Sequence, residues 1–222
     1  MGVPPLTFRS RTTGKAAGGP AIHWGRDARR REAPTPPGRQ VTGYRLRRAG
    51  FVARFRPPHL GQAAVLAALS REAETVVVGV GSANRYDLDN PFTGAETAEL
   101  LRPLLPEGRA ELHLLPDLYD GPRWAAMVRE RFGEIDRFVT ANPYVRSLVE
   151  GFWTVEHPLS LLAPSERVAV DGKAVRRAMA RGEEWARLVP PQVARALRER
   201  GLVRRFREEF GLETLAREAP AP

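Results

Sequence analysis

The most constraining feature of this sequence is a strand–helix–strand pattern in residues 51–83. Residues 51–55 are apolar and strand-like, and residues 60–71 are rich in Ala and Leu, which is typical of a helix. Residues 75–80 are dominated by β-branched side chains, as buried parallel strands require. His59 and the first backbone N–H groups of the helix lie where nucleotide-binding α/β units bind phosphate. The pattern therefore predicts the first half of such a unit.

The same alternation continues through the rest of the chain. We expect further strands at residues 111–115, 137–140 and 153–156, and helices at residues 93–101, 123–132, 143–150, 174–181 and 190–200. Thr93 and Glu96 are spaced as in a capping box at a helix start. Strands that alternate with helices indicate the α/β class, here a Rossmann-like parallel sheet of about five strands flanked by helices.

The excess positive charge is confined to the N-terminal part of the chain. Residues 1–49 contain eleven Lys and Arg against two Asp and Glu, whereas residues 50–222 contain 24 of each sign. Residues 1–49 are also rich in Gly and Pro, so we expect a basic disordered tail followed by one folded domain at residues 50–222. The alternatives are an over-extended gene start and an arm that binds nucleic acid. The neutral domain itself gives no reason to expect a nucleic-acid partner.

Several classes of chemistry are excluded by composition. The chain has no cysteine, so it has no disulfide, no thiolate nucleophile and no Cys-ligated zinc. No Walker, GxSxG or HExxH motif is present. No apolar run approaches the roughly 20 residues of a membrane span, and the N-terminus lacks the apolar core of a secretory signal. We therefore expect a cytoplasmic protein without a membrane partner.

Four motifs in a consistent order carry a resemblance to a known family. They read ARFRPPHLG at residues 53–61, GVGSA at 79–83, DNPFT at 89–93 and DGKAVRRAMARGEEWARLVPPQV at 171–193. In these motifs the chain resembles the archaeal-type nicotinamide-nucleotide adenylyltransferases of the HxGH nucleotidyltransferase superfamily. The resemblance covers residues 50–200 and implies a nucleotidyltransferase domain at 50–222. The implied reaction transfers the adenylyl group of ATP to nicotinamide mononucleotide, giving NAD and pyrophosphate, with Mg²⁺ accompanying ATP and no metal held by side chains.

The catalytic residues implied by the resemblance are His59, Arg54 and Arg176. His59 and Gly61 match the first His and the Gly of HxGH, but Gln62 replaces the second His, so the motif reads HLGQ. A glutamine amide donates a neutral hydrogen bond and carries no charge. Charge-assisted hydrogen bonds are the stronger kind, so this change predicts a slower enzyme or compensation by another cation.

Four further positions depart from the family pattern. Arg56 replaces a Gln, and is either an extra cation beside the phosphates or a solvent-facing side chain. Thr97 replaces an Arg, which removes a phosphate-facing cation. The motif usually written SGTxIR reads DGKAVR, and its Asp171 either opposes phosphate binding or caps the following helix. Lys173 in the same motif is a candidate for a compensating phosphate contact.

The same motifs assign further residues to nucleotide binding. For ATP these residues are Phe55, Gly61, Gln62, Gly79, Ser82, Asn90, Gly172 and Lys173. Most of them follow a predicted strand or open a predicted helix, where ligands of open α/β sheets bind.

For the acceptor nucleotide, the resemblance implies an aromatic residue after the third strand and an Asn-Pro pair after the fourth. Trp124, Asn142 and Pro143 fit these places. Tyr119 and Phe152 are weaker candidates for the aromatic position. The other histidines in the domain, His113 and His157, lie in strand-like segments and are interpreted as packed side chains.

The altered motifs leave two other functions open. One is a nucleotide-binding pseudoenzyme of the same fold, and the other is a nucleotidyltransferase with a different phosphorylated acceptor. The sequence does not decide between nicotinamide mononucleotide and nicotinic acid mononucleotide. Related proteins form rings, so the resemblance implies a homo-oligomer, although no segment identifies a contact surface.

Overall fold

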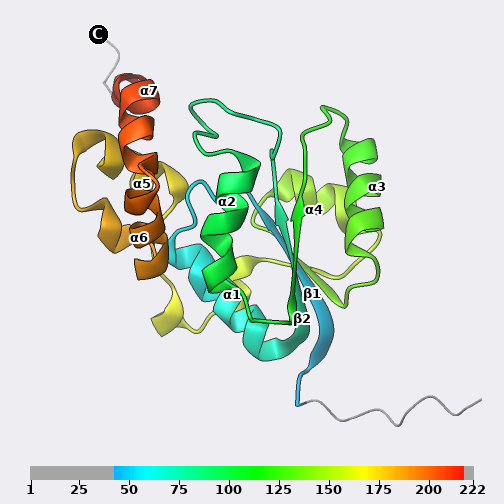
Figure 1. Ribbon diagram of the computed structural model, residues 1–222. Helices are drawn as coiled ribbons and strands as arrows, with labels where there is room; N and C mark the ends of the chain where they lie inside the picture. Colours follow the sequence, from blue (N-terminus) through cyan, green and yellow to red (C-terminus); the bar gives the residue numbers. More distant parts are fainter. Residues whose placement is uncertain (1–42, 218–222) are drawn as a thin grey trace, which may run out of the picture. The chain divides into compact units, whose positions relative to one another are not determined.

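The computed structural model describes residues 43–217, and at its centre lies a five-stranded parallel sheet (Figure 1). The strands are β1 (Leu46–Ala53), β2 (Ala73–Val80), β3 (Ala110–Leu114), β4 (Arg137–Val139) and β5 (Val155–Glu156). Their order is β3-β2-β1-β4-β5, and all neighbours run parallel. The predicted α/β class and the five-stranded sheet are thus confirmed. The strand order reverses between β1 and β4, which is where open parallel sheets bind ligands.

Helices connect the strands and extend the chain beyond them. The α-helices of the described residues are α1 (Leu60–Glu72), α2 (Gly94–Leu101), α3 (Gly121–Phe132), α4 (Pro143–Val149), α5 (Gly172–Arg181), α6 (Pro191–Glu199) and α7 (Leu202–Ala216). Short 3-10 helices are η1 (Arg102–Leu104), η2 (Pro158–Leu161), η3 (Pro164–Glu166) and η4 (Trp185–Leu188). The capping box predicted at Thr93 is present, because Thr93 Oγ1 accepts from Glu96 N at 3.2 Å and Thr93 N donates to Glu96 Oε2 at 2.9 Å.

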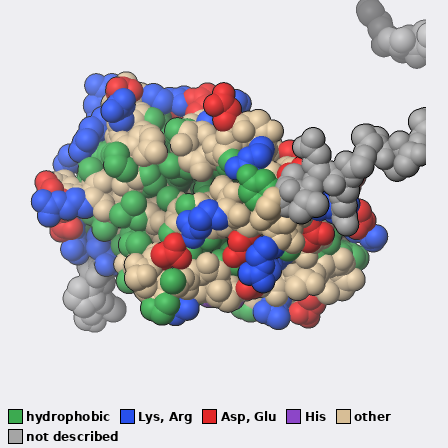
Figure 2. Space-filling view, turned by 90° about the horizontal axis from the view of Figure 1, so that it is seen from below, with side chains coloured by type: hydrophobic (Ala, Val, Ile, Leu, Met, Phe, Trp, Pro, Cys, Tyr) green, Lys and Arg blue, Asp and Glu red, His purple; other side chains and the backbone are tan. Residues whose placement is uncertain are grey.

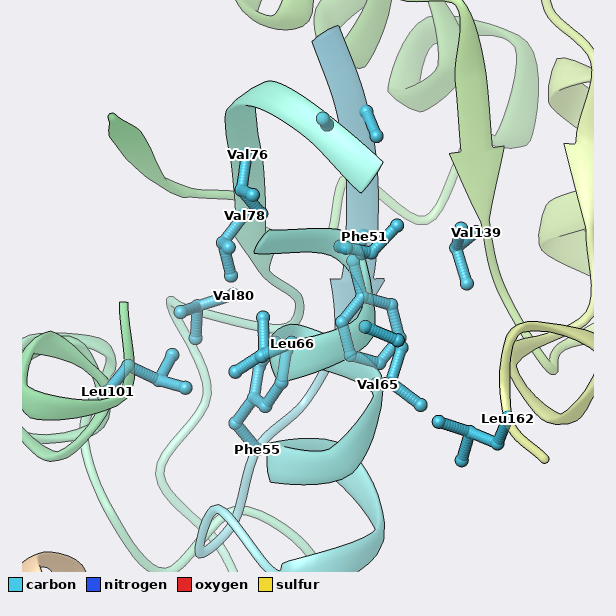
Figure 3. Packing of buried hydrophobic residues seen from close by; sticks show 14 residues of the cluster. Phe51, Phe55, Val65, Leu66, Val76, Val78, Val80, Leu101, Val139 and Leu162 are labelled. Atoms are coloured by element: carbon cyan, nitrogen blue, oxygen red, sulfur yellow. The ribbon is translucent and has the colours of Figure 1, made fainter. Parts of the chain in front are cut away.

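Alternate residues of the central strands pack on opposite faces of the sheet, as the two-residue period of a strand requires. On one face Phe51 and Val78 pack with residues of α1 such as Leu66 (Figure 3). On the other face Val52 and Val77 pack with residues of α3 and with Trp153. A separate apolar cluster joins α5, α6 and α7 to α2. The sheet is therefore covered on both faces, which explains why β2 lacks polar alternation.

The first strand begins earlier than the sequence predicts. It starts at Leu46 rather than at residue 51, so residues 46–49, which the sequence assigns to the tail, belong to β1. The apolar run misses them because they include charged side chains. Arg48 is accommodated in the sheet by hydrogen bonds to both carboxylate oxygens of Glu111 and to the Phe132 carbonyl. The remaining tail, residues 1–42, lies outside the described residues.

Helix α7 is a second departure from the elements that the sequence predicts. Leu202 and Phe206 are buried at the i, i+4 spacing of a helix, and Arg205 forms an ion pair with Glu96 at 2.6 Å. The many charges of this segment hide its short apolar stripe. On the face shown in Figure 2, basic and acidic side chains are interspersed. Within residues 43–217, no helix has both the length and the apolar character of a membrane span.

Candidate active site

A cavity of about 800 Å³ lies at the carboxyl edge of the sheet. Its walls come from segments that follow each of the five strands, as expected for the ligand site of an open α/β sheet. The lining includes Arg54, His59, Gly61, Gln62, Gly81, Ser82, Asp117, Tyr119, Asp120, Trp124, Thr140, Asn142, Tyr144 and His157, together with apolar residues such as Val65, Leu118 and Leu162. The volume falls within the ~300–1,000 Å³ of small-molecule sites.

The cavity separates the predicted site residues into two groups. Seven of them line it: Arg54, His59, Gly61, Gln62, Ser82, Trp124 and Asn142. Seven others are absent from its lining: Phe55, Gly79, Asn90, Pro143, Gly172, Lys173 and Arg176. The predicted phosphate loop after β1 is thus part of the cavity, whereas no residue of the C-terminal motif at 171–193 lines it.

His59 is the N-cap residue of α1, so it immediately precedes the first backbone N–H groups of that helix. Its Nδ1 is buried and has no hydrogen-bond partner within the described residues. Burial lowers the pKa of the His59 imidazole to about 4, and the negative charge of Asp171 opposes this effect. The ring is therefore neutral at pH 7, and one of its two nitrogens carries a proton. A helix N-terminus with a neutral N–H donor is suited to an anionic ligand.

Gln62 has a local role that its place in the motif does not reveal. Its Oε1 accepts a hydrogen bond from the backbone N–H of His59 at 3.3 Å, and this contact caps the N-terminus of α1. Its Nε2 donates no hydrogen bond to the described residues, so one neutral donor remains for a ligand. Gly61 is constrained by close approach, since a Cβ there would lie 3.3 Å from His59 Nδ1 and from the Val168 carbonyl.

The positive charge of the cavity is small. Of the described residues that line it, Arg54 is the only Lys or Arg, while Asp117 and Asp120 contribute carboxylates. Arg56, predicted to be a cation beside the phosphates or a solvent-facing side chain, is 3% exposed, so the solvent-facing alternative is wrong, and it does not line the cavity. Arg176 lies beside it and donates from Nη1 to the Arg56 carbonyl at 2.8 Å. Its guanidinium therefore binds the turn after β1 in this structure.

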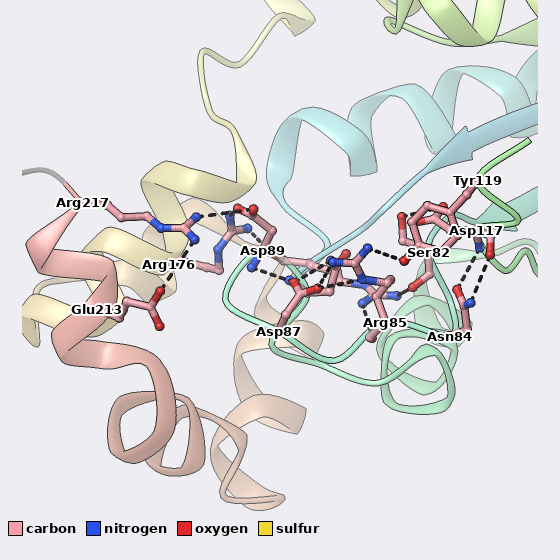
Figure 4. A network of polar contacts seen from close by, with 12 residues as sticks. Ser82, Asn84, Arg85, Asp87, Asp89, Asp117, Tyr119, Arg176, Glu213 and Arg217 are labelled. Carbon is pink, nitrogen blue, oxygen red and sulfur yellow. Dashed lines mark hydrogen bonds and ion pairs between the residues drawn. The ribbon is translucent and has the colours of Figure 1, made fainter. Parts of the chain in front are cut away.

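The loop after β2 is bonded to the loop after β3 at the cavity. Ser82 has a positive φ of 53°, and its Oγ donates to Asp117 Oδ1 at 3.1 Å. The Asn84 side-chain amide makes two further hydrogen bonds with the Asp117 backbone, because its Nδ2 donates to the Asp117 carbonyl and its Oδ1 accepts from the Asp117 N–H. Arg85 donates to the hydroxyl of Tyr119, a residue that is 81% exposed (Figure 4). These contacts hold an aromatic side chain at the edge of the cavity.

Trp124 of α3, which the sequence predicts for the aromatic position, is half-buried and lines the cavity. Asn142 also lines it, but its Oδ1 caps α4 by accepting from the backbone N–H of Tyr144 at 2.9 Å. The interpretation of His157 as a packed side chain is wrong, because this residue is exposed and lines the cavity. His113 is packed as expected, with its ring 5.6 Å from that of Phe132.

Curated proteins of one name match the chain over most of its length. The chain is 32% identical over 169 residues to a nicotinamide-nucleotide adenylyltransferase from Methanosphaerula palustris, in a match that covers 74% of this chain and 98% of that protein. It is 33% identical over 189 residues to the protein of the same name from Thermococcus kodakarensis, covering 80% of this chain and 96% of that one. The chain belongs to the nicotinamide-nucleotide adenylyltransferase family. A scan against models of protein families finds no match.

A solved structure supports the fold of this family member. The chain is similar to a bifunctional NMN adenylyltransferase/ADP-ribose pyrophosphatase from Francisella tularensis, with a TM-score of 0.60 and 14% sequence identity. The likeness covers 79% of this chain and 57% of that one, so this chain spans less than two thirds of that structure. At this identity the likeness concerns the arrangement of the sheet and helices alone.

Four positions that the family motifs associate with the nucleotide lie in the interior of this chain. Phe55 is fully buried and packs on Phe51, with ring centroids 5.3 Å apart. Gly79 lies inside β2, where a Cβ would approach a Leu115 methyl group to 2.4 Å, so this glycine serves packing. Asn90 is 4% exposed and donates to Asp87, and Thr97 is fully buried in α2. Motif membership does not separate such packing positions from ligand contacts.

The C-terminal motif forms the start of α5 and does not contribute to the cavity wall. Asp171 is the N-cap of this helix, and its Oδ1 accepts from Ala174 N at 2.7 Å, which confirms the capping alternative. Gly172 lies against the turn after β1, since a Cβ there would be 3.2 Å from the Arg56 carbonyl. Lys173 is exposed and Pro143 opens α4, both outside the lining. The cavity residues that sequence reasoning missed, above all Asp117 and Asp120, follow β3 and belong to no motif.

Proposed function

We propose that the protein transfers the adenylyl group of ATP to nicotinamide mononucleotide, forming NAD and pyrophosphate. Membership of the adenylyltransferase family supports this proposal. The observation that carries it is the cavity itself, which places His59 and the start of α1 beside Arg54 at the carboxyl edge of the sheet. We further propose that the protein acts in the cytoplasm.

The proposed chemistry needs positioning and charge stabilisation rather than a covalent nucleophile. A phosphate oxygen of the mononucleotide attacks the α-phosphorus of ATP. The bond from that phosphorus to the bridging oxygen of the β-phosphate breaks, and pyrophosphate leaves with the electron pair. The His59 imidazole, the free N–H groups of α1 and Arg54 are the donors available for the phosphate oxygens.

A divalent cation, which we propose to be Mg²⁺, would enter as part of the substrate MgATP. Mg²⁺ keeps several of its waters and binds mainly to the phosphates in such sites, so it needs few protein ligands. The carboxylates of Asp117 and Asp120 at the cavity are of the oxygen type that this cation prefers. They fit a water-mediated contact to the cation.

Because a single cation lines the cavity, we expect the enzyme to be slow. With His59 neutral and Gln62 uncharged, Arg54 carries the positive charge of the cavity lining. Removing one charge-assisted donor from a transition state reduces rates by roughly 10²–10³-fold. The same observation favours the pseudoenzyme as the second candidate function, because binding tolerates the loss of a cation better than catalysis does.

Pyrophosphate release from ATP, Mg²⁺ and nicotinamide mononucleotide by the full chain tests the proposal. Nicotinic acid mononucleotide is supplied in a parallel reaction, and the His59→Ala variant is the control for a contaminating enzyme. Turnover that is lost in His59→Ala supports the proposal. Absence of turnover with either acceptor, together with calorimetric binding of ATP, refutes it in favour of the pseudoenzyme.

A further inference from the structure

Arg56 is a buried guanidinium that the proposed chemistry does not use. It is 3% exposed, and no carboxylate of the described residues lies within ion-pair distance of it. Burial and the neighbouring Arg54 lower the pKa of Arg56 to about 10, so the group stays charged at neutral pH. Burying a charge is unfavourable unless hydrogen bonds compensate for the lost water. The partners of this side chain therefore indicate what it does.

Four backbone carbonyls surround the Arg56 side chain. Nε donates to the Arg54 carbonyl at 3.3 Å, and Nη1 donates to the Arg85 carbonyl at 3.1 Å. Nη2 donates to the carbonyls of Gly81 at 3.3 Å and Ser82 at 2.9 Å. Only a planar guanidinium offers donors in so many fixed directions, since lysine has one compact ammonium group. The arrangement uses the fork shape of arginine as well as its charge.

The four carbonyls belong to two loops that reach the cavity. Arg54 lies in the loop after β1, and its side chain is the lining cation. Gly81 and Ser82 lie in the loop after β2, and both line the cavity. Ser82 has a positive φ, which residues other than glycine adopt only when their surroundings enforce it. The hydrogen bond from Arg56 to the Ser82 carbonyl is one such constraint.

The network continues from these loops in two directions. On one side Ser82 Oγ donates to Asp117, which brings in the loop after β3. On the other side the Arg56 carbonyl accepts from Arg176 of α5, whose Nη2 lies 3.8 Å from Asp89 (Figure 4). Arg56 is thus the central member of a polar network that joins three loops of the cavity to the C-terminal helices.

We propose that Arg56 is a positioning residue, which fixes the loops after β1 and β2 so that Arg54 and Ser82 are held at the substrate phosphates. The proposal rests on the proposed adenylyl transfer. It explains how a cavity with one lining cation keeps that cation in place. Misplacement of a contacting group by about 1 Å reduces turnover by about 100-fold.

Two substitutions of Arg56 and one matched control test this inference in the full chain. Arg56→Gln is neutral and keeps one short donor group, whereas Arg56→Lys keeps the charge without the fork. The control is Arg48→Gln, which removes three hydrogen bonds at the opposite end of β1, away from the cavity. For each protein, kcat and KM for ATP are measured at a temperature at least about 15 °C below its own thermal midpoint.

Both Arg56 variants are expected to lose about 30-fold or more in kcat/KM, while Arg48→Gln stays within about twofold of wild type at a similar loss of thermal stability. Full activity in Arg56→Lys would overturn the inference, because charge alone would then suffice. Equal losses in the Arg56 and Arg48 variants would also overturn it, because the effect would reflect stability only. If Arg56→Gln does not fold, the lysine variant decides.

If the proposed function itself is wrong, wild type releases no pyrophosphate, and this result is distinct from failure of the inference on Arg56. In that case the calorimetric affinity for ATP replaces kcat/KM as the measured quantity. A Kd at least about 10-fold weaker in Arg56→Lys than in Arg48→Gln supports the positioning role. Equal affinities, or no binding by wild type, overturn it.

Discussion

The His59 imidazole gives the protein a pH dependence of stability that can be worked out from its surroundings. The ring lines the cavity, but its Nδ1 is buried without a partner, and burial lowers its pKa from 6.5 to about 4. Between these two values the unfolded chain binds a proton that the native state excludes. The free energy of unfolding therefore falls as the pH falls through this window.

The size of the effect follows from the two pKa values. They differ by about 2.5 units, and each unit corresponds to about 1.4 kcal/mol, so about 3 kcal/mol of stability is at stake. This stability is fully present above pH 6.5 and is lost by about pH 4. A loss of this size is large against the roughly 5–15 kcal/mol of a whole domain.

Urea unfolding of wild type and His59→Gln at pH 4, 5, 6 and 7 measures this contribution. Carboxyl groups titrate in the same range, but they do so in both proteins, so the difference between the two curves isolates the imidazole. We expect wild type to lose about 3 kcal/mol more than the variant between pH 7 and pH 4. Parallel curves would refute the reasoning, because the imidazole would then titrate alike in the native and unfolded states.

Three further substitutions have defined outcomes. Arg54→Ala removes the cation that lines the cavity and should lower kcat/KM in pyrophosphate release by about 100-fold; a change below about threefold would place the phosphates elsewhere. Gly79→Ala places a methyl group 2.4 Å from a Leu115 methyl and should reduce the urea-unfolding free energy by about 1–3 kcal/mol, whereas unchanged stability would contradict the packing role. Asp171→Asn keeps the helix cap but removes a negative charge near His59, so the thermal midpoint should hold while KM for ATP falls about twofold or more; a higher KM would show that the carboxylate assists binding.

Elements encoded by neighbouring residues were predictable. The capping box of Thr93 and Glu96 lies within four consecutive residues, and it is present as predicted. The apolar runs of β1 and β2 and the helix between them were also recognised, with errors of a few residues at their ends. The start of β1 was missed because its charged residues are satisfied by partners far along the chain, as Arg48 is by Glu111. Helix α7 was missed although Leu202 and Phe206 carry a helical spacing.

The motifs could be recognised from the sequence, but the surroundings of their side chains in the folded protein could not. Arg54 and Arg56 are two residues apart, yet Arg54 lines the cavity and Arg56 is enclosed by carbonyls of residues 81, 82 and 85. Asp117 reaches the cavity without belonging to any motif, because β3 lies beside β2 in the sheet.

The sequence by itself therefore determined the alternation of strands and helices as far as α6, the loop at His59 between β1 and α1, and the family of the protein. These depend on periodicity, on helix caps and on short motifs, which are properties of residues close together in the chain. Only the tertiary structure decided which motif residues face the cavity and which are buried, and how each is charged. Burial and hydrogen-bond partners come from segments far apart in sequence, and they set the lowered pKa values of His59 and Arg56.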